Sequence, residues 1–200
     1  MRRLVICLAA TCFAAPWAQA QINYNFLEAT IGSHSVELSN NASEDGVGAG
    51  FKASYEVMSF LHVYGSLEYA DFSDLDAQTT TGQIGVGTHY DFSDDKSVFV
   101  NVGAVTAETE ITVAGFGPGT VDDDGYAVSM GYRETNQTPM EFRLSLDYVK
   151  FNDSDDSDSS IDMSLQYEIT RRFKILGGYQ FGGDDDVLRF GVRYYFDRNL

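Results

Sequence analysis

The sequence is poor in features on which many soluble folds depend. It has two cysteines, three prolines and one tryptophan, and 13 basic residues stand against 30 acidic ones, a formal net charge of −17. Both cysteines, Cys7 and Cys12, lie near the start of the chain. The remainder therefore forms no disulfide and offers no thiolate for catalysis or metal binding. The negative charge argues against a nucleic-acid partner, because it would repel phosphate.

Long apolar runs are also missing, with one exception at the start. Arg2 and Arg3 precede an apolar run over residues 4–15, and Ala18-Gln19-Ala20 supplies a small-residue cleavage site. This order predicts a cleaved signal peptide over residues 1–20 and one exported domain over residues 21–200. The exported part has no run of about 18 apolar residues, which argues against spanning helices but leaves spanning strands open.

The end of the chain carries the clearest pattern that is present. From Leu188 to Phe196, apolar side chains alternate with Arg189, Gly191, Arg193 and Tyr195. This is a strict period of two that ends in an aromatic residue. A strand with one apolar face and one cationic face suits lipid outside and a polar lumen inside.

Nine earlier segments repeat this alternation, each with one face free of charge. A soluble β-sandwich also shows this alternation, but its strand ends need not be aromatic. Here aromatic residues stand at the ends of most outward faces, as in the two aromatic girdles of a membrane barrel. The pattern predicts an all-β, closed, antiparallel up-and-down transmembrane barrel of ten strands. Eight strands is the alternative, because Ser33 and Ser35 interrupt the first apolar face. The outward faces lie in residues 27–31, 47–55, 61–69, 84–90, 98–104, 126–132, 142–148, 161–169, 173–181 and 188–196.

The connections between these segments alternate in charge. Those at 39–46, 70–81, 107–125, 151–160 and 182–187 contain Asp and Glu but no Lys or Arg, whereas the others hold Lys96, Arg133, Arg171 and Arg172. Both termini of an even-stranded barrel are expected in the periplasm. The acidic connections are therefore expected to be extracellular loops.

Several short motifs resemble those of small outer-membrane β-barrel proteins of Gram-negative bacteria, of the OmpA and OmpX type. They are Tyr24-Asn25-Phe26-Leu27-Glu28-Ala29, His62-Val63-Tyr64-Gly65, Gly177-Gly178-Tyr179-Gln180-Phe181 and the closing Tyr194-Tyr195-Phe196. The resemblance implies an integral outer-membrane protein that the barrel-assembly machinery recognises through its C-terminal strand. One departure is that Asp197-Arg198-Asn199-Leu200 follow the terminal aromatic residue.

The inward faces collect the charges that the outward faces lack. Unpaired charges inside a narrow barrel are costly, and the two signs are balanced, so these residues are predicted to form a salt-bridged plug. A narrow water-filled pore is the alternative, since inward glycines leave room. The predicted lumen ionic cluster is Glu28, Lys52, Glu68, Arg143, Asp147, Asp162, Glu168, Lys174, Arg189 and Arg193.

The acidic loops are the second candidate site. Their clustered carboxylates are the hard oxygen ligands that calcium and magnesium prefer, although the spacing does not match the helix-loop-helix calcium motif. The loops are expected either to bind divalent cations weakly, which would bridge them to lipopolysaccharide, or to be simply solvated. The residues concerned are Asp153, Asp155, Asp156, Asp158, Asp184, Asp185 and Asp186.

Catalysis is not predicted. The three histidines, His34, His62 and His89, are expected to face inward without converging, and none has an acidic residue two positions before it. No cofactor is predicted.

The sequence favours a monomeric outer-membrane barrel with a structural or surface-interaction role, in membrane integrity or adhesion. A narrow porin-like channel for small solutes or ions is the alternative, and an outer-membrane enzyme a remote one.

Overall fold

The computed structural model describes residues 22–37, 43–113, 117–135, 139–154, 156–183 and 185–196. The expected signal peptide lies outside these residues. Among them, no helix is long and apolar enough to cross a bilayer. The elements, in chain order, are β1 (Phe26–Glu37), β2 (Ser43–Met58), β3 (Leu61–Phe72), the 3-10 turn η2 (Ser73–Leu75), β4 (Ala77–Ser93), β5 (Lys96–Val113), β6 (Gly117–Glu134), β7 (Met140–Phe151), β8 (Ser157–Thr170), β9 (Phe173–Phe181) and β10 (Asp185–Tyr195).

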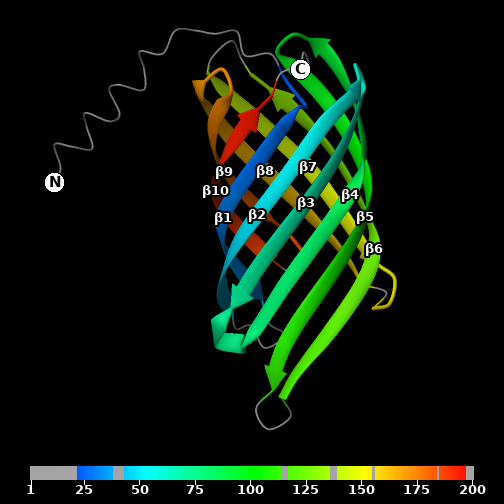
Figure 1. Cartoon of the computed structure of the whole chain (residues 1–200), viewed down its shortest axis with the longest axis vertical. Coiled ribbons are helices and arrows are strands. Elements are labelled where there is room, and N and C mark those ends of the chain that lie inside the picture. The colour runs from blue at the N-terminus through cyan, green and yellow to red at the C-terminus, as the bar shows by residue number, and fades with distance from the viewer. Residues whose placement is uncertain are drawn as a thin grey trace, which may run out of the picture.

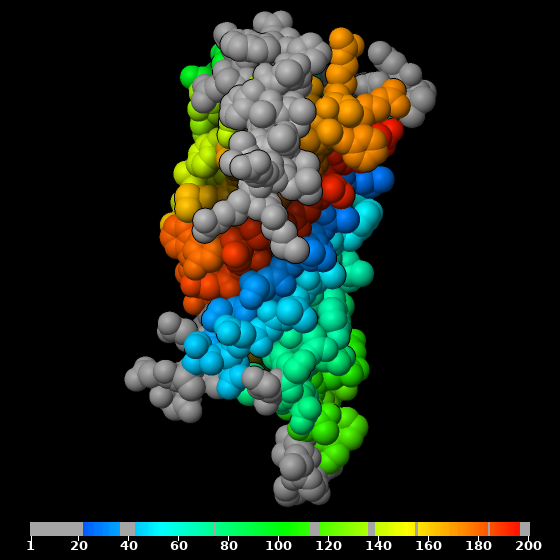
Figure 2. All heavy atoms as spheres, turned by 90° about the vertical axis from the view of Figure 1, so that its left-hand side faces the viewer, coloured from blue at the N-terminus to red at the C-terminus, as the bar shows by residue number. Residues whose placement is uncertain are grey.

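The ten strands form a closed antiparallel barrel in which each strand pairs with its sequence neighbours. Closure is made by β1 and β10, in register from the pair Phe26 and Tyr195 to the pair Val36 and Asp185. Figure 2 shows this seam, where the blue and red strands run side by side. Closure leaves the barrel wall without a free sheet edge, as a bilayer requires. The prediction of a ten-stranded barrel is confirmed, and the eight-stranded alternative is wrong.

The distribution of apolar side chains is the reverse of that in a soluble protein. Large apolar residues point outward and are exposed, such as Ile84 at 71% and Ile31 at 69%, whereas the most buried side chains are polar, such as Glu141 and Gln166. Aromatic residues pair on the outer surface near the strand ends, for example Phe173 with Tyr194 at a centroid distance of 4.9 Å. All the outward positions predicted from the alternation face outward, because a strand has a period of two.

The two ends of the barrel differ in length and charge. We call the end at which β1 begins and β10 ends the terminus end, and the opposite end the far end (Figure 1). At the far end β5 and β6 continue as a long ribbon, paired as far as Val113 and Gly117. The predicted loops 107–125 and 39–46 are therefore too long, since much of each belongs to a strand. Lys96 and Arg133 also lie in strands, β5 and β6, and not in connections as predicted.

Glycine lets large rings lie flat against the inner wall. Gly85 and Gly103 face each other across β4 and β5, and the Tyr64 ring covers them. A Cβ atom would lie 2.8 Å from Tyr64 Cε1 at Gly85 and 2.7 Å from the Tyr64 hydroxyl at Gly103. Gly131 makes the same room for Phe99, with 2.6 Å to Cζ. Two rings of the site described below are placed in this way.

Candidate functional site: the ionic lumen

A buried ion-pair network fills the lumen at the terminus end. Arg133 Nε donates to Glu141 Oε1 at 2.7 Å, and Lys174 Nζ donates to Glu141 Oε2 at 2.7 Å. All three side chains are at most 6% exposed. The Tyr195 hydroxyl lies within 3.1 Å of Gln166 Oε1 and donates there, and it accepts from Arg193 Nη1 at 3.2 Å. The carboxylate of Glu141 thus compensates two buried cations, as burial of charge demands.

The chain just before β1 turns into the lumen and completes this closure. The Tyr24 ring stacks on His89 at a centroid distance of 3.9 Å and on His62 at 4.7 Å. The guanidinium of Arg133 lies 4.6 Å from the same ring, and its Nη1 donates to the Asn23 carbonyl at 3.2 Å. The Tyr24 hydroxyl bonds Ser97 Oγ at 2.9 Å. We call the set Tyr24, His62, His89, Arg133, Glu141, Gln166, Lys174 and Tyr195 the plug.

A second layer of ion pairs lies next to the plug, toward the far end. Arg193 Nε donates to Glu28 Oε2 at 2.6 Å, and Arg143 Nη1 donates to Asp162 Oδ1 at 3.2 Å. Arg189 pairs with the other oxygen of Asp162. Each carboxylate in this layer is therefore held between strands by arginine.

The most exposed lumen charges lie toward the far end, although Asp162 at 4% and His34 at 5% are buried on that side of the plug as well. The side chain of Glu68, which faces the lumen, is 52% exposed, that of Arg189 18% and that of Arg143 12%. Arg133 and Glu141 follow at 3% and 1%. These exposures indicate that solvent reaches the lumen side chains on the far side of the plug and not those of the plug itself. We call the open part of the lumen, lined by Gly48, Gly50, Ser66, Glu68 and Arg189, the vestibule.

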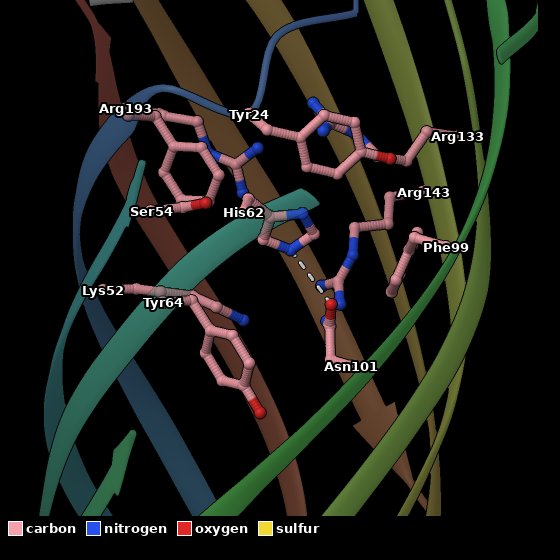
Figure 3. Close-up of a pocket in the computed structure, with 11 residues that line it drawn as sticks. Tyr24, Lys52, Ser54, His62, Tyr64, Phe99, Asn101, Arg133, Arg143 and Arg193 are labelled. Carbon is pink, nitrogen blue, oxygen red and sulfur yellow. Dashed lines mark hydrogen bonds between the residues drawn. The ribbon is translucent and has the colours of Figure 1, made fainter. Parts of the chain in front are cut away.

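A small pocket lies between the vestibule and the plug (Figure 3). It contains four cationic side chains and no carboxylate. Lys52 reaches into it with no described carboxylate oxygen within 4.0 Å of Nζ. Ser54 Oγ is buried there without a hydrogen-bond partner. The lining residues are Tyr24, Phe26, Lys52, Ser54, His62, Tyr64, Phe99, Asn101, Arg133, Arg143 and Arg193.

The predicted lumen cluster is brought together only in part. Glu28, Arg143, Asp162, Lys174, Arg189 and Arg193 form direct ion pairs. Asp147 accepts from Ser145 Oγ at 2.9 Å, Glu168 stands opposite Lys174 in the sheet register, and Glu68 lies 3.8 Å from His34 Nε2. Lys52 lies in the pocket.

Sequence reasoning missed the central pair, Arg133 and Glu141. The predicted strands ended one residue too early on either side, at Tyr132 and Phe142. Extending the same period of two by one step would have placed both side chains inward.

The aspartates proposed as cation ligands are dispersed. Asp185 faces the lumen and its Oδ2 lies 2.6 Å from His34 Nδ1, whereas Asp186 faces outward and accepts from the Tyr179 hydroxyl at 2.9 Å. Asp153 and Asp156 are exposed, and Asp158 stands opposite Val149 in β7. Asp155 and Asp184 lie outside the described residues. Within the described ranges, no group of three or more His, Cys, Asp or Glu side chains could hold a metal ion.

Asp123 instead organises the neighbouring acidic turn, beyond the apolar band. Its carboxylate accepts the backbone N–H groups of Asp153 at 3.0 Å and Ser154 at 2.9 Å. Hydrogen bonds from the Ser154 side chain and the Asp153 backbone lower the pKa of Asp123. Part of the acidic surface is therefore ordered by its own backbone donors.

The histidines are placed as predicted in one respect and not in another. All three face the lumen and are buried. His34 lies apart at the far end, as expected, but His62 and His89 converge on Tyr24 with centroids 5.7 Å apart. The His34 ring contacts Asp185, Glu68 and Phe72, and none of these three residues is a hydroxyl nucleophile.

Fold and lumen together define an integral outer-membrane β-barrel. The chain belongs to the family described as protein of unknown function, DUF481, whose match spans residues 18–188. The comparison with curated proteins finds no match.

Solved structures of outer-membrane barrels share the fold at low sequence identity. The KdgM porin in complex with disordered oligogalacturonate has a TM-score of 0.50 and 13% identity, over 86% of this chain and 99% of that one. Ail, the attachment invasion locus protein of Yersinia pestis, has a TM-score of 0.47 and 15% identity, over 87% and 100%. The Neisserial surface protein A has 0.46 and 13%, over 86% and 96%. At such identities the likeness shows the fold alone.

Proposed function

We propose that the protein is a closed, non-conducting outer-membrane barrel with a structural or surface-interaction role, in membrane integrity or adhesion. The observation that carries this proposal is the plug, in which Glu141 is 1% exposed and bonded to two cations. Opening a water path there would leave at least one buried charge without its partner, and removing the partner of a buried charge costs about 3–5 kcal/mol. The plug therefore favours a permanently closed lumen.

The same proposal includes an orientation and a set of partners. The terminus end faces the periplasm, and the acidic far end faces outward, where lipopolysaccharide would be its neighbour. Divalent cations would bridge exposed carboxylates such as Asp153 and Asp156 to lipid phosphates, because two anionic surfaces repel without a cation. The aromatic β10 would be the segment that the assembly machinery reads, and the barrel would act as a monomer since closure leaves no free sheet edge.

We infer no enzymatic activity. His34 has a carboxylate partner in Asp185, but general acid–base chemistry also needs a reacting group within reach of the other ring nitrogen. The other ring nitrogen, Nε2, lies 3.8 Å from a second carboxylate, that of Glu68. A histidine between two acids suits an ion pair and not a hydrolytic centre.

A narrow channel is the second candidate. The open vestibule favours it, since Glu68 and Arg189 are reached by water inside the barrel. In this case the plug would have to move. Only the fold is shared with the porin among the solved structures, so the likeness itself supports neither role.

Recordings of the purified protein in planar bilayers separate the two candidates. The closed barrel predicts no steady conductance above the bare membrane, while a porin of known conductance, reconstituted in parallel, gives its usual current. A steady current carried by the unmodified protein would reject the closed barrel and make transport the leading function.

A further inference from the structure

The pocket between vestibule and plug joins several unused hydrogen-bond donors. Lys52, with three N–H donors, has no carboxylate within ion-pair distance among the described residues. Arg143 Nη1 donates to Asp162, and the guanidinium lies 5.0 Å from the Phe99 ring. The other N–H groups of Arg143 remain free. Asn101 uses its Oδ1 on His62 Nε2 at 3.0 Å, so its amide N–H groups remain available. In Figure 3 these three side chains point toward one another across the pocket.

The other two arginines of the pocket already have carboxylate partners. Arg193 is shared between Glu28 and the Tyr195 hydroxyl, and Arg133 between Glu141 and the Asn23 carbonyl. They add positive charge without needing a further partner. Their carboxylates lie outside the pocket lining, so an anion in the pocket would meet no Asp or Glu side chain there.

The hydroxyl of Ser54 supplies an independent sign that the pocket is built for a ligand. Ser54 is 4% exposed, lines the pocket, and its Oγ has no hydrogen-bond partner. A buried hydroxyl without a partner costs about 1–3 kcal/mol, so such groups normally have a function or a ligand.

We propose that this pocket binds a small dissolved oxyanion, a carboxylate or phosphate group, held by Lys52, Arg143 and Asn101 with Ser54 as a further donor. Lysine and arginine bonds to such oxygens are charge-assisted and stronger than neutral ones. The anion enters through the vestibule, so the site exists in a closed barrel and goes beyond the proposed structural role.

The acidic far end does not prevent entry at physiological salt. Eight residues of β2 separate Glu44 from Lys52, roughly 26 Å along the strand at about 3.3 Å per residue. The Debye length in 0.15 M salt is about 8 Å, so the charge of Glu44 is screened at the pocket. Glu68, opposite Gly50 in β2, is nearer, but Arg189 in the same vestibule carries the opposite charge. The rim charges would slow entry at low salt.

Calorimetric titration of inorganic phosphate into the full barrel in a non-ionic, phosphate-free detergent tests the proposal. We expect saturable binding by the unmodified protein, a loss of at least tenfold in affinity for Lys52→Met, and unchanged affinity for Lys96→Met. Lys96 is the matched control because it is exposed and paired with Glu134 near the terminus end. Acetate in a second titration shows whether a carboxylate serves as well, and glucose should not bind.

Folding is checked separately so that a misfolded variant cannot mimic the result. Methionine keeps most of the length of lysine, and removing an unpaired cation should leave the heat-dependent gel shift of the folded barrel intact. Phosphate should raise the thermal midpoint of the unmodified protein but not of Lys52→Met, against sodium chloride at matched ionic strength. Absence of saturable binding, or equal binding by Lys52→Met, overturns the site. Neither result bears on conductance, which tests the proposed role.

Discussion

Toward the terminus end the lumen is filled by long charged and aromatic side chains that bond to one another, whereas toward the far end buried groups such as His34 and Phe72 stand beside glycines and the half-exposed Glu68. Both halves alternate with the same period of two, and both are polar. They differ in that Glu141 and Arg133 exclude water, while Glu68 and Arg189 meet it. The two halves therefore differ in how completely their charged side chains are buried and paired.

The largest expected effect follows from breaking the plug. Glu141→Ala leaves Arg133 and Lys174 buried without their shared carboxylate, which should lower the free energy of unfolding by about 3–5 kcal/mol. Denaturant unfolding of the refolded protein measures it. Glu68→Ala is the vestibule control and should cost less than about 1 kcal/mol, because that side chain is half exposed and screened by water. Equal costs would mean that the two halves do not differ in hydration.

A smaller effect is expected from charging the outer surface. Leu67→Arg places a cation against lipid and should cost about 2 kcal/mol, while Glu68→Arg, one residue along the same strand, points into the vestibule and should cost less than about 1 kcal/mol. The same unfolding assay in lipid vesicles measures both. If the vestibule variant were the more damaging, the far half of the lumen would have to be packed.

The smallest effect concerns the rim of the vestibule. His34 lies near the far end of β1. The preceding residue, Ser33, stands opposite Val47 and Leu188, which are the last outward apolar residues of β2 and β10 in that direction, so His34 lies one residue beyond them. Burial opposes its protonation, but the hydrogen bond to Asp185 and the charges of Asp185 and Glu68 outweigh this and raise the pKa of His34. Because the pKa of His34 is higher in the folded than in the unfolded protein, protonated His34 stabilises the fold. This stabilisation is complete below about pH 6.5 and is lost as the pH rises through the pKa of the folded state.

Unfolding midpoints measured across this range for the unmodified protein and for Asp185→Asn test the pair. The unmodified protein should lose a little stability as the pH rises above about 6.5, the ordinary pKa of histidine. The loss should shrink in Asp185→Asn, which removes the partner. An identical slope in both proteins would show that His34 and Asp185 are not coupled in solution.

Much of the fold can be predicted from the sequence, because the strands of a membrane barrel alternate regularly between apolar and polar side chains. Residues such as Ile31 and Ile84 face lipid, so their alternation with polar residues is not blurred by a shared core. Strand ends are different. Outside the apolar band both faces are polar, and the alternation that identifies a strand is lost, which is why the sequence alone predicts a loop where the ribbon of β5 and β6 lies.

The candidate site is less predictable for a related reason. That Lys174 and Arg193 face inward follows from their place in the period, but their partners lie across the lumen on strands that are distant in sequence. Tyr24 is harder still, because it precedes β1 and enters the lumen from a segment with no repeating pattern. The pocket needs all these elements in place, so only the closed structure reveals it.

The central claim is that water fills the lumen only as far as the plug, and thiol labelling measures this directly. In protein lacking residues 1–20, and so free of native cysteine, Glu68→Cys should react with a charged, membrane-impermeant thiol reagent, because this side chain is half exposed. Ser97→Cys lies beside Tyr24 in the plug at 0% exposure and should stay unreacted until the barrel is unfolded. Comparable labelling at both positions in the folded protein would contradict a closed lumen.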